Sequence, residues 1–395
     1  MYCKFSKKEI NPFMSLGKMP IANGFIEKAN FDNEFFYELE VGFSEEYSLF
    51  QLNEHTAPEK MFNDNYPFFS SSSEYMKKHF SSFASYIKKK FLNNNSKLIE
   101  IGSNDGTMLK NFDNENNEIL GFEPSKNVAQ KAIENNVPTL NLFFNKKNIS
   151  NLKKHFHNTD VICASNVICH IPDLNDLIEA IDKLLSKNGV FIFEEPYLDS
   201  MFDKISYDQI YDEHIYMFSV SSVLKIFKKY DFVLVDAIPQ QTHGGSMRYV
   251  IKRKKNEISQ NLNKLIEYEK SKKIDNLESC LDFKKNCENS KKTLLKKLND
   301  FKNDGKKICG YAATSKSTTI LNYCKIGNNY IEYICDTTKE KIGKFSPGMH
   351  IPIVDMNHFK SHQPDCIYLF AWNHKNEILS KEKNFEGEWF SHVAL

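Results

Sequence analysis

The stretch Lys97–Met108, KLIEIGSNDGTM, decides the fold that this sequence predicts. Its apolar run is typical of a buried parallel strand, and the run stops abruptly at Gly102, Asp105 and Gly106. Glycines allow backbone conformations and close approaches that a side chain would block. We therefore predict a strand, a glycine turn and a helix that starts near Met108, with the turn beneath a ligand at the carboxyl edge of an open α/β sheet. A merely tight connection is the structural alternative.

The next apolar run, ILGFEPS, ends in Glu123, about 20 residues beyond the glycine turn. An acid at the tip of a second strand accepts hydrogen bonds from both hydroxyls of a ribose lying over the first loop. The glycine pattern is not GxGxxG, which favours S-adenosylmethionine over a dinucleotide, and E-x-G-S-N-D-G resembles the class I methyltransferase loop. We expect Gly102, Asn104, Asp105 and Glu123 to bind this cofactor.

Composition bounds the classes of function. The 395 residues suffice for two or three domains. The 52 basic and 51 acidic side chains nearly balance, so the sequence predicts no positively charged surface for binding nucleic acid. No apolar run approaches the ~18 residues that cross a membrane, and no signal peptide is evident, so we expect a cytoplasmic protein without a membrane partner. The nine cysteines are scattered, and the close pairs Cys163 with Cys169 and Cys280 with Cys287 lack CxxC spacing. Neither disulfides nor a metal site are predicted.

Residues 1–75 combine short aromatic strands, near 35–41 and 47–52, with polar turns, and we expect a small lid. It ends in Tyr66 and the serines 70–73, which precede a helix with apolar positions at helical spacing: Met76, Phe80, Phe83 and Ile87. Backbone N–H groups at this helix entrance can meet an anion or a cofactor carboxylate. Simple N-capping explains the serines equally well.

Residues 76–255 alternate strands and helices, which predicts a doubly wound sheet. The expected strands lie near 98–101, 118–122, 160–164, 189–194, 232–236 and 247–252. Asn166 and His170 follow the third of these runs, at a carboxyl end. The segment YDQIYDEHIYMFS, 207–219, is too polar for a core helix, and its crowded ionisable and aromatic groups mark a functional region.

Residues 256–300 lack Pro and Gly and predict a charged helical connector. A second α/β unit, 301–395, opens with KKICGYAATSKSTTILNYC, again a strand, a glycine turn and a helix, and has further strands at IEYICD and CIYLFAWN. Ser315, Lys316, Ser317 and Thr318 stand at its helix entrance, where a lysine and hydroxyls can cradle a phosphate. The spacing is not a P-loop, and ordinary capping is the alternative.

Together these motifs resemble the sugar C-methyltransferases of deoxysugar biosynthesis, of the mycarose and tetronitrose type, over essentially the full length. The segments that carry the resemblance are LGKMPIANGF, YPFFSSSSEYMKKHF, LIEIGSNDGT, GFEPSKNVA, SNVICHIPDL, EEPYLDSM, YDQIYDEHIYMFS, THGGSMRYV, GYAATSKSTTILNYC, SPGMHIPI and FAWNHKNEI. The resemblance implies an α/β fold with a class I methyltransferase sheet, a small N-terminal domain and a C-terminal Rossmann-like domain that helps to hold an NDP-sugar.

The chain departs from the family pattern at two places. The N-terminal domain of the family usually binds zinc through paired cysteines, whereas here Cys3 stands alone, so we expect no metal. The usual Y-H-E-H cluster reads Tyr211, Asp212, Glu213 and His214, without the first histidine. The second departure leaves the substrate open more than the reaction class.

The resemblance also implies roles for single residues. Methylation of carbon next to a ketone needs a base, and His214, with an unperturbed pKa of ~6.5, is the expected one, oriented by Glu213 or a tyrosine. Donors for the enolate oxygen are expected among Tyr66, His170 and Tyr211. Asn166 is assigned to the cofactor, and the remaining residues to the sugar nucleotide: Ser315, Lys316, Ser317, His243 and Ser246.

Two rival functions stay open at this point. Sugar O-methylation on the same scaffold would use His214 on a hydroxyl, and Asp212 in place of a histidine keeps that reading alive. A non-catalytic binding protein with a degenerate methyltransferase fold is the other, and the joint presence of Glu123, His170 and His214 argues against it. The expected partner is an NDP-sugar, on a monomer or weak oligomer.

Overall fold

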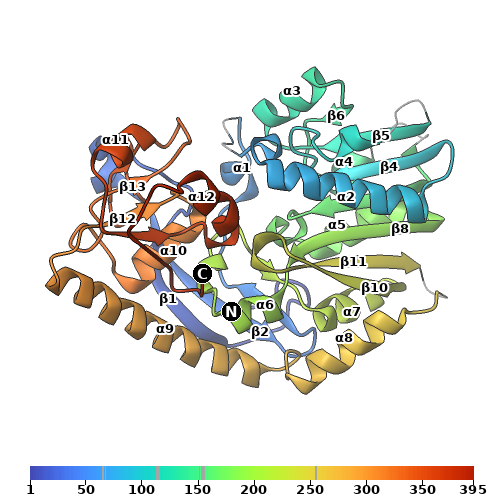
Figure 1. Cartoon of the computed structure of the whole chain (residues 1–395). Helices are drawn as coiled ribbons and strands as arrows, with labels where there is room; N and C mark the ends of the chain where they lie inside the picture. The colour runs from blue at the N-terminus through green and yellow to red at the C-terminus, as the bar shows by residue number, and fades with distance from the viewer. Residues whose placement is uncertain (65, 67, 113–115, 151, 153–155, 254–255) are drawn as a thin grey trace.

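The computed structural model describes residues 1–64, 66, 68–112, 116–150, 152, 156–253 and 256–395. Within this part of the chain the strands form three sheets, of seven, five and four strands. Figure 1 shows the seven-stranded sheet on the right, the five-stranded sheet on the left, and the long helix α9 (Leu277–Asn303) along the lower edge.

The seven-stranded sheet is the doubly wound sheet that the sequence predicts. Its neighbouring strands run parallel, except that one strand, β11, is antiparallel to both of its neighbours. In sheet order the strands are β10 (Phe232–Gln240), β11 (Ser246–Arg253), β8 (Leu185–Pro196), β7 (Thr159–Ser165), β4 (Ser96–Ile101), β5 (Asn117–Phe122) and β6 (Thr139–Leu140). All six expected strands are confirmed, whereas the short β6 was not predicted.

Alternate residues of these strands pack against helices on opposite faces, as period-two side chains require. Leu98 belongs to the core beneath α2 (Glu74–Phe91), whereas Ile99 and Ile101 belong to the core beneath α5 (Leu174–Leu184) and α7 (Val220–Lys228). The four predicted apolar positions of α2 are all buried. The other helices of this unit are α3 (Lys126–Glu134), α4 (Lys146–Ile149), α6 (Leu198–Lys204) and α8 (Gln260–Ser271).

The prediction of a helix directly after the glycine turn is wrong. The chain forms only a 3-10 turn there, Leu109–Asn111, and Phe112 is extended and buried. The side-chain amide of Asn111 donates to the carbonyls of Thr107 and Met108, which closes the turn instead of letting it propagate. Met108, Leu109 and Phe112 pack in one core with α2.

The five-stranded sheet is wholly parallel and carries the expected Rossmann-like unit. Its strands, in sheet order, are β14 (Ile353–Val354), β13 (Ile334–Cys335), β12 (Ile308–Tyr311), β15 (Cys366–Leu369) and β16 (Glu388–Phe390). Its helices are α10 (Ser315–Cys324), α11 (Met356–Ser361) and α12 (Lys375–Lys381). One detail differs: Gly310 lies inside β12, where a Cβ would come 2.5 Å from the ring of Phe370, and the turn is made at Ala312 with a φ of +71°.

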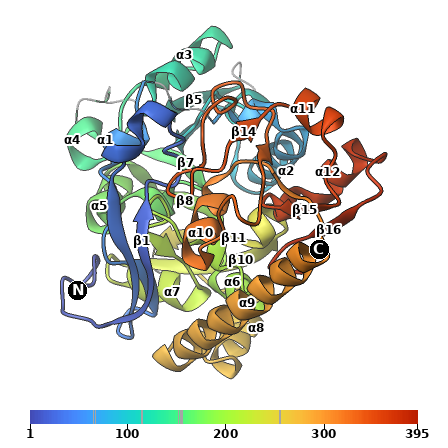
Figure 2. The same cartoon turned by 90° about the vertical axis from the view of Figure 1, so that its left-hand side faces the viewer.

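The four-stranded sheet is antiparallel and lies in the N-terminal region. Its strands are β1 (Pro12–Pro20), β2 (Phe36–Ser44), β3 (Leu49–Leu52) and β9 (Tyr216–Met217), and a short helix α1 (Pro58–Met61) follows β3. The small lid expected here stays a prediction, and side chains of β1 and β2 share one hydrophobic core with α9, α10 and β12. Figure 2 shows β1 passing close to α10, as Figure 1 does.

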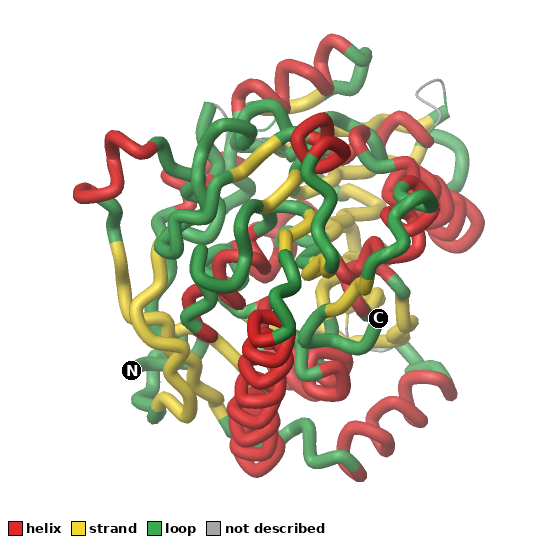
Figure 3. Tube along the Cα trace, turned by 60° about the vertical axis from the view of Figure 1, so that its left-hand side comes forward, coloured by secondary structure: helices red, strands yellow, loops and turns green. Residues whose placement is uncertain are grey.

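The region predicted as a helical connector consists of two consecutive helices, α8 and α9, which Figure 1 labels and which are the two lowest red coils in Figure 3. No helix within the described ranges has both the length and the hydropathy needed to cross a membrane. The domain boundaries at 75 and 300 stay predictions, and the one at 255 lies outside the described residues. Strand β9, from the middle of the chain, completes the N-terminal sheet.

Candidate active site

The loop after β4 requires both of its glycines. Gly102 has a φ of +65° and Gly106 a φ of +76°, in the left-handed region that favours glycine. A Cβ on Gly102 would lie 2.3 Å from Cγ2 of Val167, and one on Gly106 would lie 2.8 Å from Cγ2 of Val137. The loop is therefore held against two neighbouring segments, in a single shape.

Glu123 fixes this loop from the end of β5. Its Oε2 accepts the backbone N–H of Asn104 at 3.0 Å, and its Oε1 accepts that of Ser125 at 2.8 Å. Burial raises the pKa of the carboxyl, and the two backbone donors oppose that rise. Since an ionised carboxylate has about four lone-pair positions, two are left for other donors such as ribose hydroxyls.

The serine run is tied to the glycine loop. The N–H of Ser70 donates to Oδ1 of Asn104 at 2.8 Å, and the N–H of Ser71 donates to Oδ2 of Asp105 at 3.0 Å. Asp105 is fully buried and also accepts the hydroxyl of Thr107 at 2.6 Å. The backbone donors expected to meet an anion thus meet these side chains, and Ser73 is the N-cap of α2.

Tyr66 lies near both ends of the site. Burial raises the pKa of its hydroxyl well above the usual value, and the carboxyls of Glu213 and Glu123 raise it further. The ring of Phe62 packs against Tyr66 and His170, with centroid distances of 5.4 and 5.6 Å. Tyr66 is therefore close to the glycine loop on one side and to the segment 207–219 on the other.

His170 follows β7 in a 3-10 turn, η5 (Ile168–His170), that a buried acid holds. Oε1 of Glu195 accepts the N–H groups of Val167, Ile168 and Cys169 at 2.9, 2.6 and 3.3 Å. Nδ1 of His170 lies 2.5 Å from the carbonyl oxygen of Glu213, so Nδ1 carries the proton and donates. Burial lowers the pKa of His170, and in the neutral ring Nε2 is an acceptor.

Asn166, at the end of β7, adopts a φ of +56°, and its N–H donates to the carbonyl of Glu194 at 2.8 Å. The amide oxygen of Asn166 is buried and has no hydrogen-bond partner within the part of the chain described. A buried acceptor without a donor points to a missing ligand.

His214 is held by two hydrogen bonds. Its Nδ1 lies 2.8 Å from the carbonyl oxygen of Gln209 and therefore carries the proton, so Nε2 accepts the hydroxyl of Tyr211 at 2.7 Å. Burial lowers the pKa of His214 well below its usual value, and neighbouring His170 lowers it further. The imidazole is neutral and presents one fixed lone pair.

The acids of this segment face the N-terminal region. Asp212 accepts the N–H of Ala22 at 3.1 Å and the hydroxyl of Thr56 at 2.9 Å, and burial raises its pKa to about 7. Glu213 accepts the amide of Asn23 at 2.5 Å. Of the two orienting groups expected for His214, the structure supplies Tyr211 and not Glu213.

Basic side chains from separate elements gather beside this segment. Lys316, in the first turn of α10, has no hydrogen-bond or ion-pair partner among the described residues. Burial lowers the pKa of its ammonium group, and the negative charge of Asp208 partly offsets that decrease. His243, in η7 (Thr242–Gly244), has a buried Nε2 without a partner in the same part of the chain. Burial lowers its pKa to about 3, and the charges of Lys316, His374 and His79 contribute.

The hydroxyls expected to bind substrate divide into two groups. Ser317 donates to the carbonyl of Thr314 at 2.5 Å and accepts its N–H at 3.1 Å, so the capping alternative accounts for it. Ser246 donates to the carbonyl of Thr242 at 2.9 Å and is buried. Ser315, the first residue of α10, stays beside Lys316 as a candidate.

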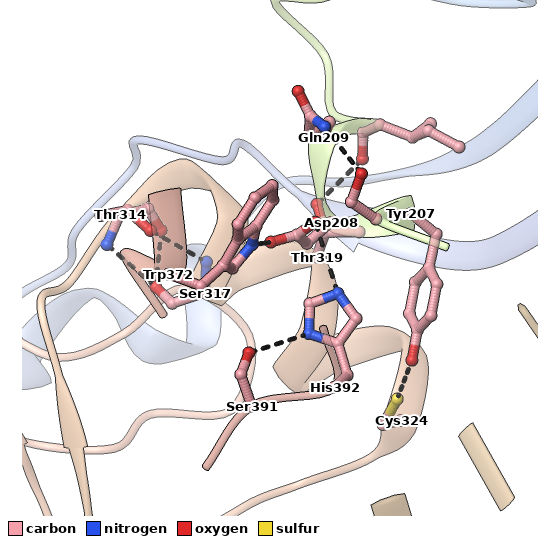
Figure 4. A network of polar contacts seen from close by, with 12 residues as sticks. Tyr207, Asp208, Gln209, Thr314, Ser317, Thr319, Cys324, Trp372, Ser391 and His392 are labelled. Atoms are coloured by element: carbon pink, nitrogen blue, oxygen red, sulfur yellow. Dashed lines mark hydrogen bonds and ion pairs between the residues drawn. The ribbon is translucent and has the colours of Figure 1, made fainter. Parts of the chain in front are cut away.

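The C-terminal unit anchors the segment 207–219 through Asp208, as Figure 4 shows. Oδ2 of Asp208 accepts the indole N–H of Trp372 at 2.6 Å, and Oδ1 lies 3.4 Å from Nε2 of His392. Asp208 and Glu195 were not singled out in the sequence. The available signals were the density of polar groups after Tyr207 and the two acids that end β8.

Three family profiles match almost the whole chain. They are described as a putative zinc binding domain (residues 3–62), a methyltransferase domain (73–237) and a C-methyltransferase C-terminal domain (241–393). The C-methyltransferase NovU of Streptomyces niveus is 26% identical over 376 residues, which cover 94% of this chain and 89% of that protein. The chain belongs to the C-methyltransferases. The O-methylation and non-catalytic alternatives are thereby set aside.

Solved structures also resemble part of this C-methyltransferase. The plantazolicin methyltransferase BpumL, in complex with SAH, has a TM-score of 0.35 at 16% identity and covers 44% of this chain and 82% of that one. Magnesium protoporphyrin IX methyltransferase from Synechocystis PCC 6803, with bound SAM, has a TM-score of 0.35 at 11% identity and covers 45% and 79%.

S-adenosylmethionine is the cofactor of the C-methyltransferase, and its residues fit that molecule. The glycine loop is held in one shape by the packing of Val167 and Val137 against Gly102 and Gly106. Glu123 keeps two lone-pair positions, and the amide oxygen of Asn166 lacks a donor among the described residues. The assignment of single residues to the cofactor remains a prediction.

The N-terminal region of the C-methyltransferase does not fit zinc. Between residues 3 and 62, Cys3 and His55 are the only cysteine and histidine, whereas a structural zinc site needs four ligands. Nζ of Lys4 lies 3.1 Å from Nδ1 of His55 and donates to the carbonyl of Asn53 at 2.8 Å. Burial and this lysine lower the pKa of His55 to about 4. The side chain of Lys4 thus ties the start of the chain to the segment 53–55.

Proposed function

We propose that the enzyme methylates carbon 3 of a nucleotide-linked 4-keto-deoxysugar and that His214 removes the proton from that carbon. The observation that carries the proposal is the neutral His214, whose only free lone pair is held against the hydroxyl of Tyr211. Methylation at carbon requires a carbanion equivalent, and a neighbouring ketone makes a C–H bond acidic enough for a side chain to break.

His214 is oriented for this task by the backbone. The carbonyl of Gln209 keeps the proton on Nδ1, so Nε2 is the atom that receives the substrate proton. The hydroxyl of Tyr211 lies on that lone pair and must leave it when substrate binds. The ketone oxygen of the sugar is the acceptor that would replace His214.

Two tyrosines supply the donors for the enolate oxygen. Tyr211 turns from His214 to this oxygen, and Tyr66 lies nearby on the side of the glycine loop. Preorganised donors at a developing oxyanion are worth about 2.7–4 kcal/mol each in acyl-transfer enzymes. His170, also expected as a donor, is an acceptor at Nε2 because its Nδ1–H is used by Glu213.

S-adenosylmethionine supplies an electrophilic methyl group when it is bound. The residues proposed to hold it are Gly102, Asn104, Asp105, Glu123 and Asn166. Asn104 and Asp105 act mainly by fixing the loop to the serine run. Holding carbon and methyl donor in one geometry supplies much of the rate gain in such a transfer.

The basic side chains Lys316, His243, His79 and His374 support the proposal that the substrate sugar is linked to a nucleotide. Lys316 and His243 have no partner among the described residues, and His79 and His374 are close enough to influence the pKa of His243. Asp208 is the carboxylate that raises the pKa of Lys316, and it already accepts a hydrogen bond from the indole N–H of Trp372. A cation without a counter-charge at a helix entrance suits a diphosphate, with Ser315 beside it.

Hydrogen exchange at the sugar carbon tests the base directly. In deuterium oxide and without methyl donor, wild-type enzyme should exchange the carbon-3 hydrogen of an NDP-4-keto-deoxysugar, measured by NMR. His214→Asn keeps much of the size and polarity but supplies no base, so exchange and methyl transfer should fall by about 10²- to 10⁴-fold while substrate affinity stays nearly intact.

His157→Asn is the matched control, because His157 is exposed and lies outside the site. Exchange in His214→Asn at the wild-type rate would remove His214 from the role of base. A methyl group found by NMR at another carbon would instead keep the base and correct the position.

A further inference from the structure

Cys169, His170 and His214 bring three metal-binding groups together beside the reaction centre. Their ligand atoms, one sulfur and two ring nitrogens, all lie within 4.8 Å of one another. Cys169 and His170 belong to η5, whereas His214 follows η6 (Tyr207–Gln209). Within the described ranges no other group of three or more His, Cys, Asp or Glu side chains meets this condition.

Both histidines already have the outer contacts typical of metal ligands. A ligating histidine usually donates its second ring N–H to a carboxylate or a backbone carbonyl, which fixes the ring and directs the other nitrogen at the metal. Nδ1 of His170 lies 2.5 Å from the carbonyl of Glu213, and Nδ1 of His214 lies 2.8 Å from that of Gln209. In both neutral rings the lone pair is therefore on Nε2.

The third group adds sulfur, which becomes negatively charged when a metal ion displaces the thiol proton. Cys169 is buried with a free thiol, and its backbone N–H lies 3.3 Å from a carboxylate oxygen of Glu195. The other oxygen of Glu195 is buried without a partner among the described residues. A thiolate and two imidazoles select zinc or a similarly soft ion over magnesium or calcium.

We propose that Cys169, His170 and His214 form a reversible Zn²⁺ site that inhibits the enzyme by occupying the lone pair of its base. In a tetrahedral zinc site with S and N ligands the donor atoms are about 3.5 Å apart, so a small closing movement completes the site. The ion forms bonds to Sγ and to both Nε2 atoms, the thiol proton leaves to water, and Tyr211 loses its acceptor.

The fourth coordination position stays open for water. Such an ion is a blocker of the base and not a resident cofactor. Only the inhibition rests on the proposed role of His214, because binding itself needs the three ligand atoms alone.

Cobalt(II) spectroscopy of the full-length protein measures binding without any activity. After treatment with EDTA and its removal, Co²⁺ should bind at one equivalent and give a thiolate-to-cobalt charge-transfer band together with tetrahedral visible bands. One equivalent of Zn²⁺ should bleach both. Cys169→Ser should lose the charge-transfer band. It should also weaken cobalt binding by about 100-fold or more, because loss of a group that only hydrogen-bonds to a metal ligand already weakens binding 10- to 100-fold.

Two cysteine variants serve as controls. Cys163→Ala changes another buried thiol, on β7. Cys3→Ser changes the only cysteine in residues 3–62, the region that matches the zinc-binding profile. Both variants should keep the wild-type spectrum. A band that survives in Cys169→Ser, or one that disappears in Cys3→Ser, would overturn the proposed site. The absence of any thiolate band in the wild type would do the same.

Inhibition is tested separately. Micromolar Zn²⁺ should stop methyl transfer in the wild type, and EDTA should restore it, whereas Cys169→Ala should keep its activity and tolerate higher zinc concentrations. Equal inhibition of both proteins would refute inhibition through this site. If cobalt binds as expected but His214→Asn still exchanges substrate hydrogen, the base assignment fails and the metal site stands.

Discussion

Replacing Glu123 by glutamine should weaken binding of S-adenosylmethionine about thirtyfold. The carboxylate uses one lone pair on each oxygen for the N–H groups of Asn104 and Ser125, which leaves two for the ribose hydroxyls. The amide removes the charge and turns one acceptor into a donor. Losing charge-assisted hydrogen bonds to the ribose should cost about 2 kcal/mol, which equals roughly thirtyfold in the dissociation constant.

The same substitution should also lower stability, because one of the two buried N–H groups loses its acceptor. The expected decrease in the free energy of unfolding is about 1–3 kcal/mol. Isothermal titration calorimetry gives the affinity, and urea denaturation gives the stability. Affinity is to be measured at a temperature at which the variant is fully folded.

Glu269→Gln is the matched control for this measurement. Glu269 is fully buried on α8 and accepts the hydroxyl of Tyr197, the N–H groups of Val220 and Ser221 and the hydroxyl of Ser221, away from the glycine loop. It should lose stability and keep cofactor affinity. Unchanged affinity in folded Glu123→Gln, or an equal loss in Glu269→Gln, would refute a ribose contact at Glu123.

Three further outcomes are expected. Lys316→Ala should raise KM for the sugar nucleotide more than it lowers kcat, since a phosphate contact is present in ground and transition states alike, whereas exposed Lys381→Ala should change neither. EDTA treatment should leave the melting temperature unchanged, because the N-terminal region lacks zinc ligands; stoichiometric zinc that depends on Cys3 would contradict this. The folded pKa of His55 is about 4, below its unfolded value of about 6.5, so its contribution to stability is lost as pH falls through this window. Melting temperatures from pH 4 to 7 should therefore depend less on pH in His55→Gln than in the wild type.

Local patterns predicted the parts of the fold that depend on near neighbours. The strand before Gly102 and the apolar stripe of α2 follow from residue spacing alone, and the structure has both. The helix after the glycine turn failed for a local reason too: Asn111 closes the turn with its own amide. That competition between a side chain and the helix is invisible to apolar periodicity.

The chemistry of the site depended on contacts that no local pattern contains. The indole of Trp372 bonds to Asp208 across 164 residues, and the ring of His170 bonds to the carbonyl of Glu213 across 43. The second contact sets the tautomer of His170, which turns an expected donor into an acceptor. The sequence predicts no metal site at Cys169 because no second cysteine stands at CxxC spacing, and that local pattern does not show that the fold brings His214 to Cys169 and the adjacent His170.

The segment 207–214 contacts both the N-terminal region and the C-terminal unit, which precede and follow the cofactor sheet in the chain. Its polar residues are buried, and a buried polar group is costly unless it is paired. The N-terminal region supplies partners for Asp212 and Glu213, and the C-terminal unit supplies Trp372 for Asp208. Those contacts fix the backbone whose Gln209 carbonyl orients His214. The flanking units therefore hold His214, the proposed base, apart from any contact they make with substrate.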